Sequence, residues 1–477
     1  MFERRTKIVA TIGPASRDPE ILDRMVEAGM DVARLNFSHG THEDHAETIR
    51  LVGEASERVG RAVAILQDLP GPKIRIGAIK GGRAILKGGQ RVTFICGEEG
   101  EANAEDGRLT VNWAGLPASV EPGETIYLAD GAVRLRTLEA RPGDQEIDAE
   151  VEIGGVITTR QGLNVPSPVD DLPSVLEEDL VHLEAGEKMG VDIVAPSFVR
   201  RPEEIIELRE YTRAPIIAKI EKPQAVDRAE DIIRASDGIM VARGDLGIEL
   251  PVAEVPMVQK RLLRLAGERA RVSITATQML DSMVRSPRPT RAEVADVANA
   301  ILDGTDAVML SQETAVGAHP VEAVAMMDSI ARTTEREAPY EYWNEHRVAR
   351  DARDPGYTVA HSAVEAADQL KLDALIVPTL SGRSARLVSA HRPIVPIFAL
   401  SPGRETVRRC GLLWGVTAAL MRRHETTEEL IADAGRRVIE LGWCRPGQRV
   451  GITAGLPSGR PGTTSLFQVQ TLEPLAG

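Results

Sequence analysis

The sequence predicts an α/β protein whose main part is a TIM (β/α)₈ barrel, and three features of the pattern support this fold class. Eight short apolar runs typical of buried strands recur over most of the 477 residues, largely separated by segments of helical length. The alternation is interrupted once, after the third run, by a glycine-rich interval without helical periodicity. It begins again toward the C-terminal end, which indicates a further α/β domain.

The eight predicted strands each have a short apolar core and a polar or turn-forming end: Lys7–Gly13, Val32–Ser38, Ala64–Leu69, Asp192–Ser197, Pro215–Glu221, Gly238–Arg243, Val272–Gln278 and Ala307–Ser311. Helical segments such as Pro19–Gly29 and Glu203–Thr212 lie between most of them. Because the chemistry of a (β/α)₈ barrel lies at the C-terminal ends of its strands, we expect the functional residues there. We predict barrel residues at 1–69 and 168–343, an inserted β domain at 70–167 and a C-terminal α/β domain at 344–477.

The two segments outside the barrel have different patterns. The inserted segment contains short alternating stretches at Arg91–Cys96, Glu124–Leu128 and Val133–Leu138, separated by glycine and proline turns, and therefore predicts a small all-β domain. In the C-terminal segment helices and strands alternate, which predicts a separate parallel sheet with these elements: Val359–Leu370, Ala374–Thr379, Ser384–Ala390, Ile394–Leu400, Thr426–Leu441 and Arg449–Ala454.

The composition excludes several classes of protein. Hydrophobic residues make up 43% and charged residues 27% of the chain, as in an ordinary soluble globular protein. The formal net charge of −14 argues against nucleic-acid or anionic-membrane binding. Cys96, Cys410 and Cys444 are too widely spaced to indicate a disulfide framework or a zinc site. The sequence has neither a signal-peptide pattern nor an apolar run that could span a membrane, so we expect a cytoplasmic protein.

Charged residues at strand ends are the most informative feature, because a buried barrel strand does not need them for stability. The fifth strand ends with Lys219 and Glu221, which alternation places on the same side. The loop after the sixth strand carries Arg243 and Asp245. Glu221 and Asp245, on adjacent strands, could share a Mg²⁺ ion, which binds through few carboxylates plus substrate oxygens. A structural ion-pair network of the same four residues explains this cluster equally well.

Polar residues from other strand ends point to the same region. Arg34, Asn36 and Ser38 alternate to one face of the second strand and offer a guanidinium and two oxygen ligands to a phosphate-bearing substrate. Asn36 and Ser38 could instead simply lead into a turn. Further polar residues at or after strand ends are Asp68, Lys73, Arg75, Thr277 and Glu313. Convergence from so many strands indicates a site rather than a stabilising network.

Three histidines after the second strand, His39, His42 and His45, do not predict a metal site. Thr41 and Asp44 have the spacing of a helix capping box. This pattern predicts that His42 and His45 lie on a solvent-facing first turn of the following helix.

Taken in order, these residues resemble the pyruvate kinase family over essentially the whole chain. The blocks that match are Thr6–Pro14, Ala33–Gly40, Ile217–Glu221, Met240–Gly247, Ala276–Leu280 and Leu310–Thr314. Six blocks in order, with a β insertion after the third strand, form a highly specific pattern. The resemblance implies a small β-barrel domain that acts as a lid and a C-terminal regulatory domain. It implies a homotetrameric enzyme that transfers the phosphoryl group of phosphoenolpyruvate to ADP, giving pyruvate and ATP in the last step of glycolysis.

The resemblance also implies roles for residues that match the family pattern. Arg34 would hold the transferred phosphate, and Lys219 would stabilise charge on it in the transition state. Glu221 and Asp245 would bind Mg²⁺ or Mn²⁺ together with the substrate.

The resemblance places the two substrates as well. The carboxylate of phosphoenolpyruvate would face Thr277 and the backbone of three residues, Ala242, Arg243 and Gly244. Water near Thr277 would bring the proton that completes pyruvate. The nucleotide phosphates would lie near Asn36, His39 and Arg75. Gln161 stands where many members have a nucleotide-contacting lysine, so we do not predict it as a site residue.

One departure concerns the monovalent cation. Many family members bind K⁺ with residues at the positions of Asn36, Ser38 and Asp68 and with a following threonine, and they carry a glutamate at the position of Lys73. Here Leu69 replaces the threonine and Lys73 replaces the glutamate. The chain thus resembles the potassium-independent branch of the family, in which the lysine ammonium stands in for the ion, and we expect no K⁺ requirement.

A strand–loop–helix segment in the C-terminal domain offers backbone amides to an anion. It contains Thr379, Ser381, Gly382, Arg383 and Ser384. The loop Gly455–Gly462 could close over it. An ordinary helix cap by Ser381 or Ser384 is the alternative, and the resemblance favours a phosphorylated allosteric effector.

Two rival functions stay open at this point. A barrel lyase or aldolase that enolises pyruvate would share the carboxylate pair but would need neither the β insertion nor Arg34 with Arg75. A non-catalytic relative could bind a metabolite on the same fold. The intact cluster of Lys219, Glu221 and Asp245 argues against that reading, because sequence drift should first erase such charges.

Overall fold

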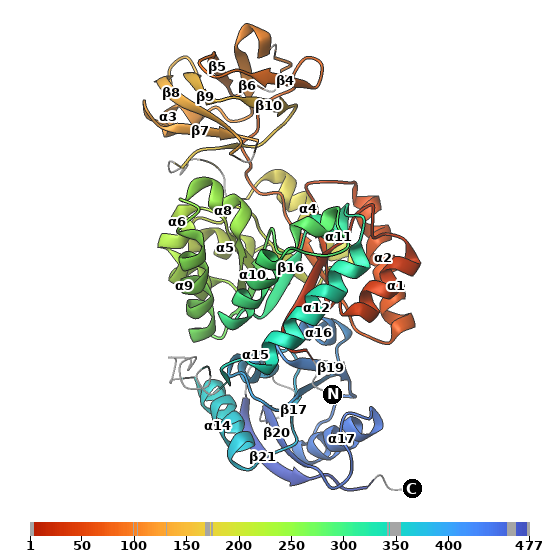
Figure 1. Cartoon of the computed structure of the whole chain (residues 1–477). Coiled ribbons are helices and arrows are strands. Elements are labelled where there is room, and N and C mark those ends of the chain that lie inside the picture. Colours follow the sequence, from red (N-terminus) through yellow and green to blue (C-terminus); the bar gives the residue numbers. More distant parts are fainter. Residues whose placement is uncertain are drawn as a thin grey trace.

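The computed structural model describes residues 4–98, 100–102, 104–129, 131–166, 172, 175–340, 343, 354–455 and 464–474. Figure 1 shows three parts along one long axis: a β unit at the top, a barrel ringed by helices in the middle and an α/β unit at the bottom.

The barrel sheet consists of eight parallel strands: β1 Lys7–Thr11, β2 Val32–Asn36, β3 Ala64–Asp68, β12 Ile193–Ala195, β13 Ile217–Ile220, β14 Gly238–Ala242, β15 Val272–Ala276 and β16 Ala307–Leu310. They are ordered β12-β3-β2-β1-β16-β15-β14-β13. A parallel bridge between Val194 and Ile216 joins the two ends of this series and brings the sheet to a nearly closed ring. The predicted barrel fold is therefore confirmed.

All eight predicted strands are present, and each ends one or two residues before the predicted C-terminal residue. Ser38, Glu221 and Gln278, which we placed at strand ends, lie in the loops that follow. Gln278 has a left-handed φ of 52°, which a β ladder cannot accommodate. The polar ends of these segments therefore belong to the site and not to the sheet.

Helices cover the outside of the barrel (Figure 1). They are α1 Pro19–Ala28, α2 His42–Val59, α4 Glu177–Met189, α5 Pro202–Leu208, α6 Pro223–Asp227, α7 Ala229–Ala235, α8 Arg243–Glu249, α9 Val255–Glu268, α10 Arg291–Leu302, α11 Gln312–Ala315 and α12 Pro320–Arg336, with the short helix η2 Asp281–Val284. Each strand is followed by at least one of them. Over the part of the chain that the structure describes, no helix is both long and apolar enough to cross a membrane.

The β unit is inserted between β3 and α4, as predicted. Its strands are β4 Arg83–Leu86, β5 Arg91–Cys96, β6 Arg108–Val111, β7 Thr125–Leu128, β8 Val133–Arg141, β9 Glu146–Ile153, β10 Gly155–Thr158 and β11 Leu163–Asn164, with the short helices η1 Ala104–Asp106 and α3 Leu116–Ser119. They form a six-stranded sheet in the order β11-β7-β8-β9-β5-β6 and a two-stranded sheet of β10 and β4. The inward side chains form a core of their own around Phe94.

The C-terminal unit is an α/β layer structure. Its elements are α14 Pro355–Gln369, β17 Ala374–Pro378, α15 Arg383–Ala390, β18 Ile397–Ser401, α16 Arg404–Arg409, η3 Cys410–Leu412, β19 Val416–Leu420, α17 Thr427–Glu440, β20 Arg449–Gly455 and β21 Thr464–Thr471. The strand order is β19-β18-β17-β20-β21. The last strand pairs antiparallel with β20, so the predicted purely parallel sheet has one antiparallel edge.

A buried guanidinium joins the C-terminal unit to the barrel. Arg392, just after α15, is 0% exposed, and its Nη1 lies 2.8 Å from Asp306 Oδ1 before β16. Its Nη2 donates to the carbonyl of Gly304 at 2.8 Å, and its guanidinium lies over the Trp414 ring at 4.4 Å. Nearby, Lys7 at the start of β1 donates to the carbonyl of Val416 at 2.7 Å. The N-terminal end of the barrel therefore rests on the C-terminal unit through buried polar contacts.

Candidate active site

Lys219, from the end of β13, lies at the centre of a buried polar cluster at the C-terminal end of the barrel. Its Nζ donates to Asp68 Oδ1 at 3.0 Å and to Ser197 Oγ at 2.7 Å, and it lies 3.1 Å from Glu221 Oε1. Burial by itself lowers the pKa of this ammonium, but Asp68 and Glu221 outweigh burial and raise it above its ordinary value. Lys219 is therefore a fixed positive charge at neutral pH.

Asp68, from the end of β3, connects two cations. Its Oδ2 accepts a hydrogen bond from Arg34 Nε at 2.7 Å, while its Oδ1 faces Lys219. Burial alone would raise the pKa of this carboxyl, but Arg34 and Lys219 hold it below its ordinary value. Arg34 also donates through Nη1 to Thr11 Oγ1 at 2.9 Å. One ionised carboxylate thus fixes both cations relative to each other, which the sequence pattern did not reveal.

Glu221 and Asp245 form the expected carboxylate pair on adjacent strand ends, and they differ in environment. Glu221 is 1% exposed, and its Oε2 accepts from the Phe198 amide at 2.7 Å. Burial raises the pKa of Glu221; Lys219 opposes this shift and Asp245 adds to it. The Asp245 side chain is 26% exposed, and its Oδ1 lies 3.8 Å from Lys73 Nζ.

This pair fits a divalent cation bound jointly with substrate. A cation between the two carboxylates would relieve the repulsion by Asp245, which adds to the effect of burial in raising the pKa of Glu221. Among the described residues, no group of three or more histidine, cysteine, aspartate and glutamate side chains is arranged to hold a metal ion. A Mg²⁺ ion, which usually binds through one or two carboxylates, would complete its coordination with substrate oxygens and water.

The alternative of a single structural ion-pair network is contradicted by the contacts. Lys219 pairs with Glu221, but Arg243 turns away and pairs with Asp296 at 2.8 Å. Asp245 faces Lys73. The four predicted members therefore do not form one network.

Phe198, in the loop after β12, is a site residue that sequence reasoning missed. It has a left-handed φ of 56°, which is uncommon for a residue other than glycine and points its amide at Glu221. Its ring lies 5.7 Å from Lys73 Nζ and 5.9 Å from Lys222 Nζ. Ser197 before it was also missed as a partner of Lys219. A residue that contributes its backbone amide to a site cannot be recognised from its side-chain type in a single sequence.

Thr277 forms the other wall of the site. It has a left-handed φ of 69°, a genuine outlier for a β-branched residue, and such strain tends to occur at functional sites. Its Oγ1 accepts from the Gly244 amide at 2.7 Å, while its carbonyl accepts from Arg243 Nη2 at 2.8 Å. The Arg243 side chain therefore supports the turn, and the backbone at Ala242, Arg243 and Gly244 lies beside Thr277.

The residues after β2 form a turn at the rim. Asn36 Oδ1 accepts from the Ser38 amide at 3.2 Å, and Ser38 and His39 are exposed. The capping box of Thr41 and Asp44 is confirmed.

The prediction that His45 faces solvent is wrong. His45 is 4% exposed and stacks on the Phe37 ring with centroids 4.0 Å apart. His42 is partly buried, and its Nε2 lies 2.8 Å from His182 Nδ1. The first turn of α2 therefore packs against Phe37 and α4, because the fourth residue of a helix already faces inward.

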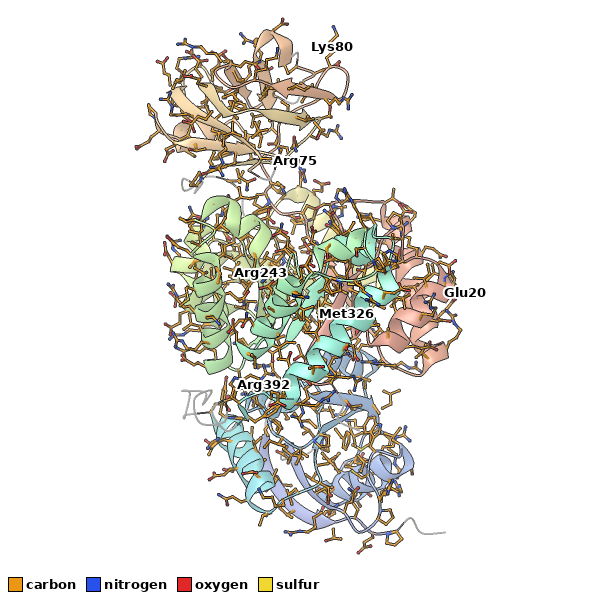
Figure 2. All side chains as sticks on the ribbon, in the orientation of Figure 1. Glu20, Arg75, Lys80, Arg243, Met326 and Arg392 are labelled. Carbon is orange, nitrogen blue, oxygen red and sulfur yellow. The ribbon has the colours of Figure 1, made fainter. Side chains whose placement is uncertain are left out.

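The remaining predicted residues around the barrel mouth have distinct partners. Arg75 lies at the base of the β unit, facing the barrel, as Figure 2 shows, and its Nη1 donates to the Arg160 carbonyl at 3.2 Å. Gln161 Oε1 accepts from the Thr158 amide in its own turn. Glu313, which we counted among the converging residues, accepts from the backbone amides of Leu280 and Ser311 and so braces the rim loops.

Lys73 lies between the β unit and the barrel. Its side chain packs on Gly162, where an added Cβ would come within 2.6 Å of Lys73 Cε. It is a quarter exposed and faces Asp245. Within the described residues, no ion pair or hydrogen bond joins its ammonium to Asn36, Ser38 or Asp68.

The predicted anion loop of the C-terminal unit has the expected strand–loop–helix form. α15 begins at Arg383 after Gly382, which has a left-handed φ of 83°, and no side chain caps the helix. Thr379 Oγ1 accepts from the Gly382 amide at 3.0 Å. The Ser384 hydroxyl instead contacts Thr464 Oγ1 at 2.6 Å. Ser381 is exposed, so the alternative of a serine cap is not supported. Of the predicted covering loop, residues 456–462 lie outside the described residues.

The fold and the site together define a (β/α)₈ phosphotransferase with a cationic centre beside a carboxylate pair. Comparison with known proteins identifies the family. The family model "Pyruvate kinase, barrel domain" matches residues 3–324, and "Pyruvate kinase, alpha/beta domain" matches residues 357–470. A pyruvate kinase of Agrobacterium vitis is 43% identical over 98% of this chain and 98% of its own length.

Two further relatives agree. A pyruvate kinase of Geobacillus stearothermophilus is 41% identical over 99% of this chain and 81% of its own length. One of Clostridium acetobutylicum is 38% identical over 98% of this chain and 100% of its own length. The chain belongs to the pyruvate kinase family and is an enzyme of that class.

Proposed function

We propose that this enzyme transfers the phosphoryl group of phosphoenolpyruvate to ADP, giving pyruvate and ATP, as the last step of glycolysis. One observation carries the proposal: a buried, permanently charged Lys219 and a guanidinium of Arg34 are held by the same carboxylate, Asp68. This is the arrangement that a migrating phosphoryl group needs, because its transition state is loose and its charge is spread over several oxygens.

Arg34 and Lys219 act on the phosphoryl group. Within the described chain, Arg34 Nη2 makes no hydrogen bond and is available to a phosphate oxygen, while Nε and Nη1 are held by Asp68 and Thr11. Lys219 is fixed before substrate arrives, so no reorganisation is needed as charge develops on the transferred group. Asp68 positions both cations.

Glu221 and Asp245 would hold Mg²⁺ or Mn²⁺. When bound, the cation would supply positive charge that offsets the negative charge of the substrates. The Phe198 amide and Lys219 keep Glu221 in place, so one ligand is rigid, whereas the half-buried Asp245 can adjust to the substrate.

The two substrates bind different residues around the barrel mouth. The phosphoenolpyruvate carboxylate faces the backbone of Ala242, Arg243 and Gly244 beside Thr277. The ADP phosphates lie near Asn36, His39 and Arg75, the last of which is brought to the barrel mouth by the β unit. That unit, residues 70–167, is the lid, and closure over the barrel segments 1–69 and 168–343 would exclude water from the transfer.

Lys73 supplies the charge that K⁺ provides elsewhere in the family, so the enzyme belongs to the potassium-independent branch. Its ammonium faces Asp245 at 3.8 Å, and Leu69 offers no hydroxyl ligand to an ion. The monovalent-ion region formed by Asn36, Ser38 and Asp68 is therefore not needed as a K⁺ site.

The C-terminal unit, residues 344–477, regulates the enzyme. A phosphorylated effector binds the loop formed by Thr379, Ser381, Gly382, Arg383 and Ser384. The uncapped start of α15 supports this, because it leaves backbone amides and the positive end of the helix dipole available. We also propose a homotetramer, to be checked by light scattering, in the cytoplasm, where the three buried, unpaired cysteines would stay reduced.

The decisive experiment measures pyruvate formation by the purified full-length chain supplied with phosphoenolpyruvate, ADP and Mg²⁺. We expect equal amounts of pyruvate and ATP, with no product when ADP or the divalent ion is omitted. A barrel lyase or aldolase would act on pyruvate without ADP, and a non-catalytic relative would give neither product. Either of those results would overturn the proposal.

A further inference from the structure

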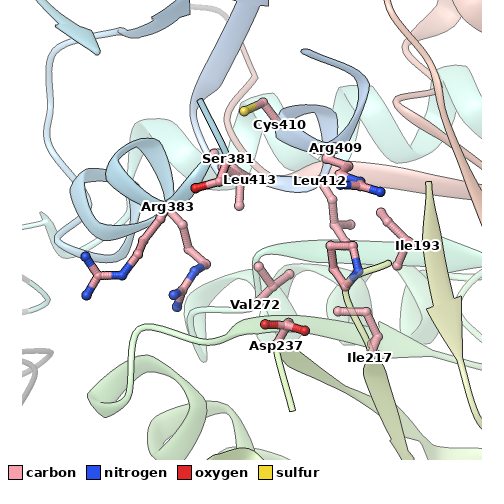
Figure 3. Close-up of a pocket in the computed structure, with 13 residues that line it drawn as sticks. Ile193, Ile217, Asp237, Val272, Ser381, Arg383, Arg409, Cys410, Leu412 and Leu413 are labelled. Carbon is pink, nitrogen blue, oxygen red and sulfur yellow. The ribbon is translucent and has the colours of Figure 1, made fainter. Parts of the chain in front are cut away.

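A cavity lies at the opposite end of the barrel from the active site, between the first residues of three strands and the C-terminal unit. Its volume is about 260 Å³, slightly below the ~300–1,000 Å³ typical of small-molecule sites. Figure 3 shows Ile217, Val272 and Asp237 on the barrel side and Ser381, Arg409 and Leu413 on the other. We call it the floor cavity.

The wall of the floor cavity is mainly apolar. Six residues provide this surface: Ile193, Pro215, Ile217, Val272, Leu412 and Leu413. A ligand would therefore need an apolar body. An inorganic ion alone would leave this surface unmatched.

The charges that face the floor cavity are mostly positive. Arg383, Arg386 and Arg409 line it, and the only carboxylate among the described lining residues is that of Asp237. Asp237 Oδ2 is already engaged, because it accepts from Arg209 Nη2 at 2.8 Å and from the Ile216 amide at 3.0 Å. Arg383 pairs with Asp354, and Arg409 lies 3.6 Å from Glu405, so Arg386 is the lining arginine for which the described residues supply no carboxylate partner.

Arg386 is the central cation of this set. Its Nη1 donates to the Ala270 carbonyl just before β15, and in the described part of the chain no carboxylate lies within ion-pair distance of it. Burial, and then repulsion by Arg271, lower the pKa of this guanidinium to about 10, so it still carries its charge at neutral pH. The Arg386 side chain is partly buried, and an anion in the cavity would supply the counter-charge that the described residues do not provide.

The floor cavity adjoins the proposed effector loop and shares Ser381, Gly382 and Arg383 with it, but it opens toward the barrel. The Ser384 hydroxyl contacts Thr464 of β21, whereas Arg386 reaches the barrel through Ala270. The helix therefore presents one side to the effector loop and another to the barrel floor.

We propose that the floor cavity binds a small organic anion, an apolar body with one carboxylate or phosphate group, between the barrel and the C-terminal unit. The apolar wall takes the body, and Arg386 and Arg409 take the acidic group. A zwitterionic amino acid fits less well, because its ammonium would face the arginines while Asp237 is occupied. The inference is independent of the proposed reaction.

Isothermal titration calorimetry on the full-length chain tests the proposal with three matched probes: phenylacetate, phenyl phosphate and the neutral 2-phenylacetamide. We expect at least one anion to bind, and the neutral amide to bind at least about tenfold more weakly, equivalent to about 1.4 kcal/mol. The tighter anion identifies the preferred head group. L-Phenylalanine should bind more weakly than phenylacetate.

Point substitutions show whether the probes bind in the floor cavity. Phenyl phosphate could also enter the active site, so only the binding that Arg386→Gln weakens by about tenfold or more is assigned to the floor cavity. Asp237→Asn should tighten binding severalfold, a gain that misfolding cannot produce. Arg264→Gln, at an exposed arginine of α9, should change nothing. The proposal is overturned if neither anion binds up to millimolar concentration, if the neutral amide binds equally well, or if Arg386→Gln and Asp237→Asn both leave the affinity unchanged.

Discussion

Removing the charge of Lys73 tests whether this lysine supplies the positive charge that a monovalent cation would otherwise provide in the active site. The Lys73 ammonium lies 3.8 Å from the Asp245 carboxylate. At an effective dielectric constant near 20, two unit charges at this separation interact by about 4 kcal/mol. The lysine is a quarter exposed, and solvent screening reduces the figure by roughly half, to about 2 kcal/mol.

A loss of about 2 kcal/mol corresponds to a decrease of about 30-fold in rate. If the Lys73 charge acts on a substrate anion at a similar distance, Lys73→Met should lower kcat/KM by that factor. Lys73→Glu should lower it further, because a second carboxylate would then face Asp245. Added K⁺ should restore Lys73→Glu only in part, since Leu69 is buried and has no hydroxyl to offer.

The assay is steady-state turnover in tetramethylammonium buffer, with and without K⁺. The unmodified enzyme should be fully active without K⁺. Lys80→Glu, at an exposed lysine on the β unit far from the barrel (Figure 2), is the matched control and should behave like the unmodified enzyme. Two results would refute the reasoning: normal activity of Lys73→Glu, or a several-fold activation of the unmodified enzyme by K⁺.

Four further predictions follow from the contacts. Lys219→Met should lower kcat by several orders of magnitude with little change in phosphoenolpyruvate binding, because one lost donor to the transition state costs about 3–4 kcal/mol; more than a tenth of normal turnover would contradict this. Glu221→Gln and Asp245→Asn should each raise the Mg²⁺ concentration needed for half-maximal activity. If both variants depend on Mg²⁺ like the unmodified enzyme, the two carboxylates have a structural role instead. Burial lowers the pKa of His45 below its ordinary 6.5, so the unfolded chain binds more protons below that pH. Thermal unfolding should therefore show stability falling as pH decreases from about 6.5, and less so in His45→Phe. Ser384→Asp should abolish any shift of the phosphoenolpyruvate saturation curve by a sugar phosphate or nucleotide, because it places a negative charge at the start of α15; if no effector shifts the curve of the unmodified enzyme, the loop has no such role.

The barrel was predictable because its strands are short apolar runs with helices between them. The alternation of residues predicted Lys219 and Glu221 on the same side of a strand. The prediction that Glu221 and Asp245 lie close together required neighbouring strands, and the structure pairs β13 with β14. The features that mark the end of a strand span only a few neighbouring residues, so they can be recognised in a single sequence.

The internal order of the site was less predictable. The position of Asp68 between Arg34 and Lys219 depends on distances between three different strands, which no local pattern encodes. Phe198 contributes a backbone amide in a left-handed conformation, and its side-chain type gives no hint of that. His45 was misplaced because a capping box fixes where a helix begins but not which residues of its first turn face inward.

The buried contact between Arg392 and Asp306 couples the stability of the barrel to that of the C-terminal unit. Expressing the barrel alone would remove the cation that pairs with Asp306, and expressing the C-terminal unit alone would expose Arg392 and Trp414 to water. Breaking such a buried pair typically destabilises a protein by about 3–5 kcal/mol, a large part of the stability of a whole domain. A protease nick or a gene fusion is therefore better tolerated in the β unit, which has its own core, than at the junction beneath the barrel.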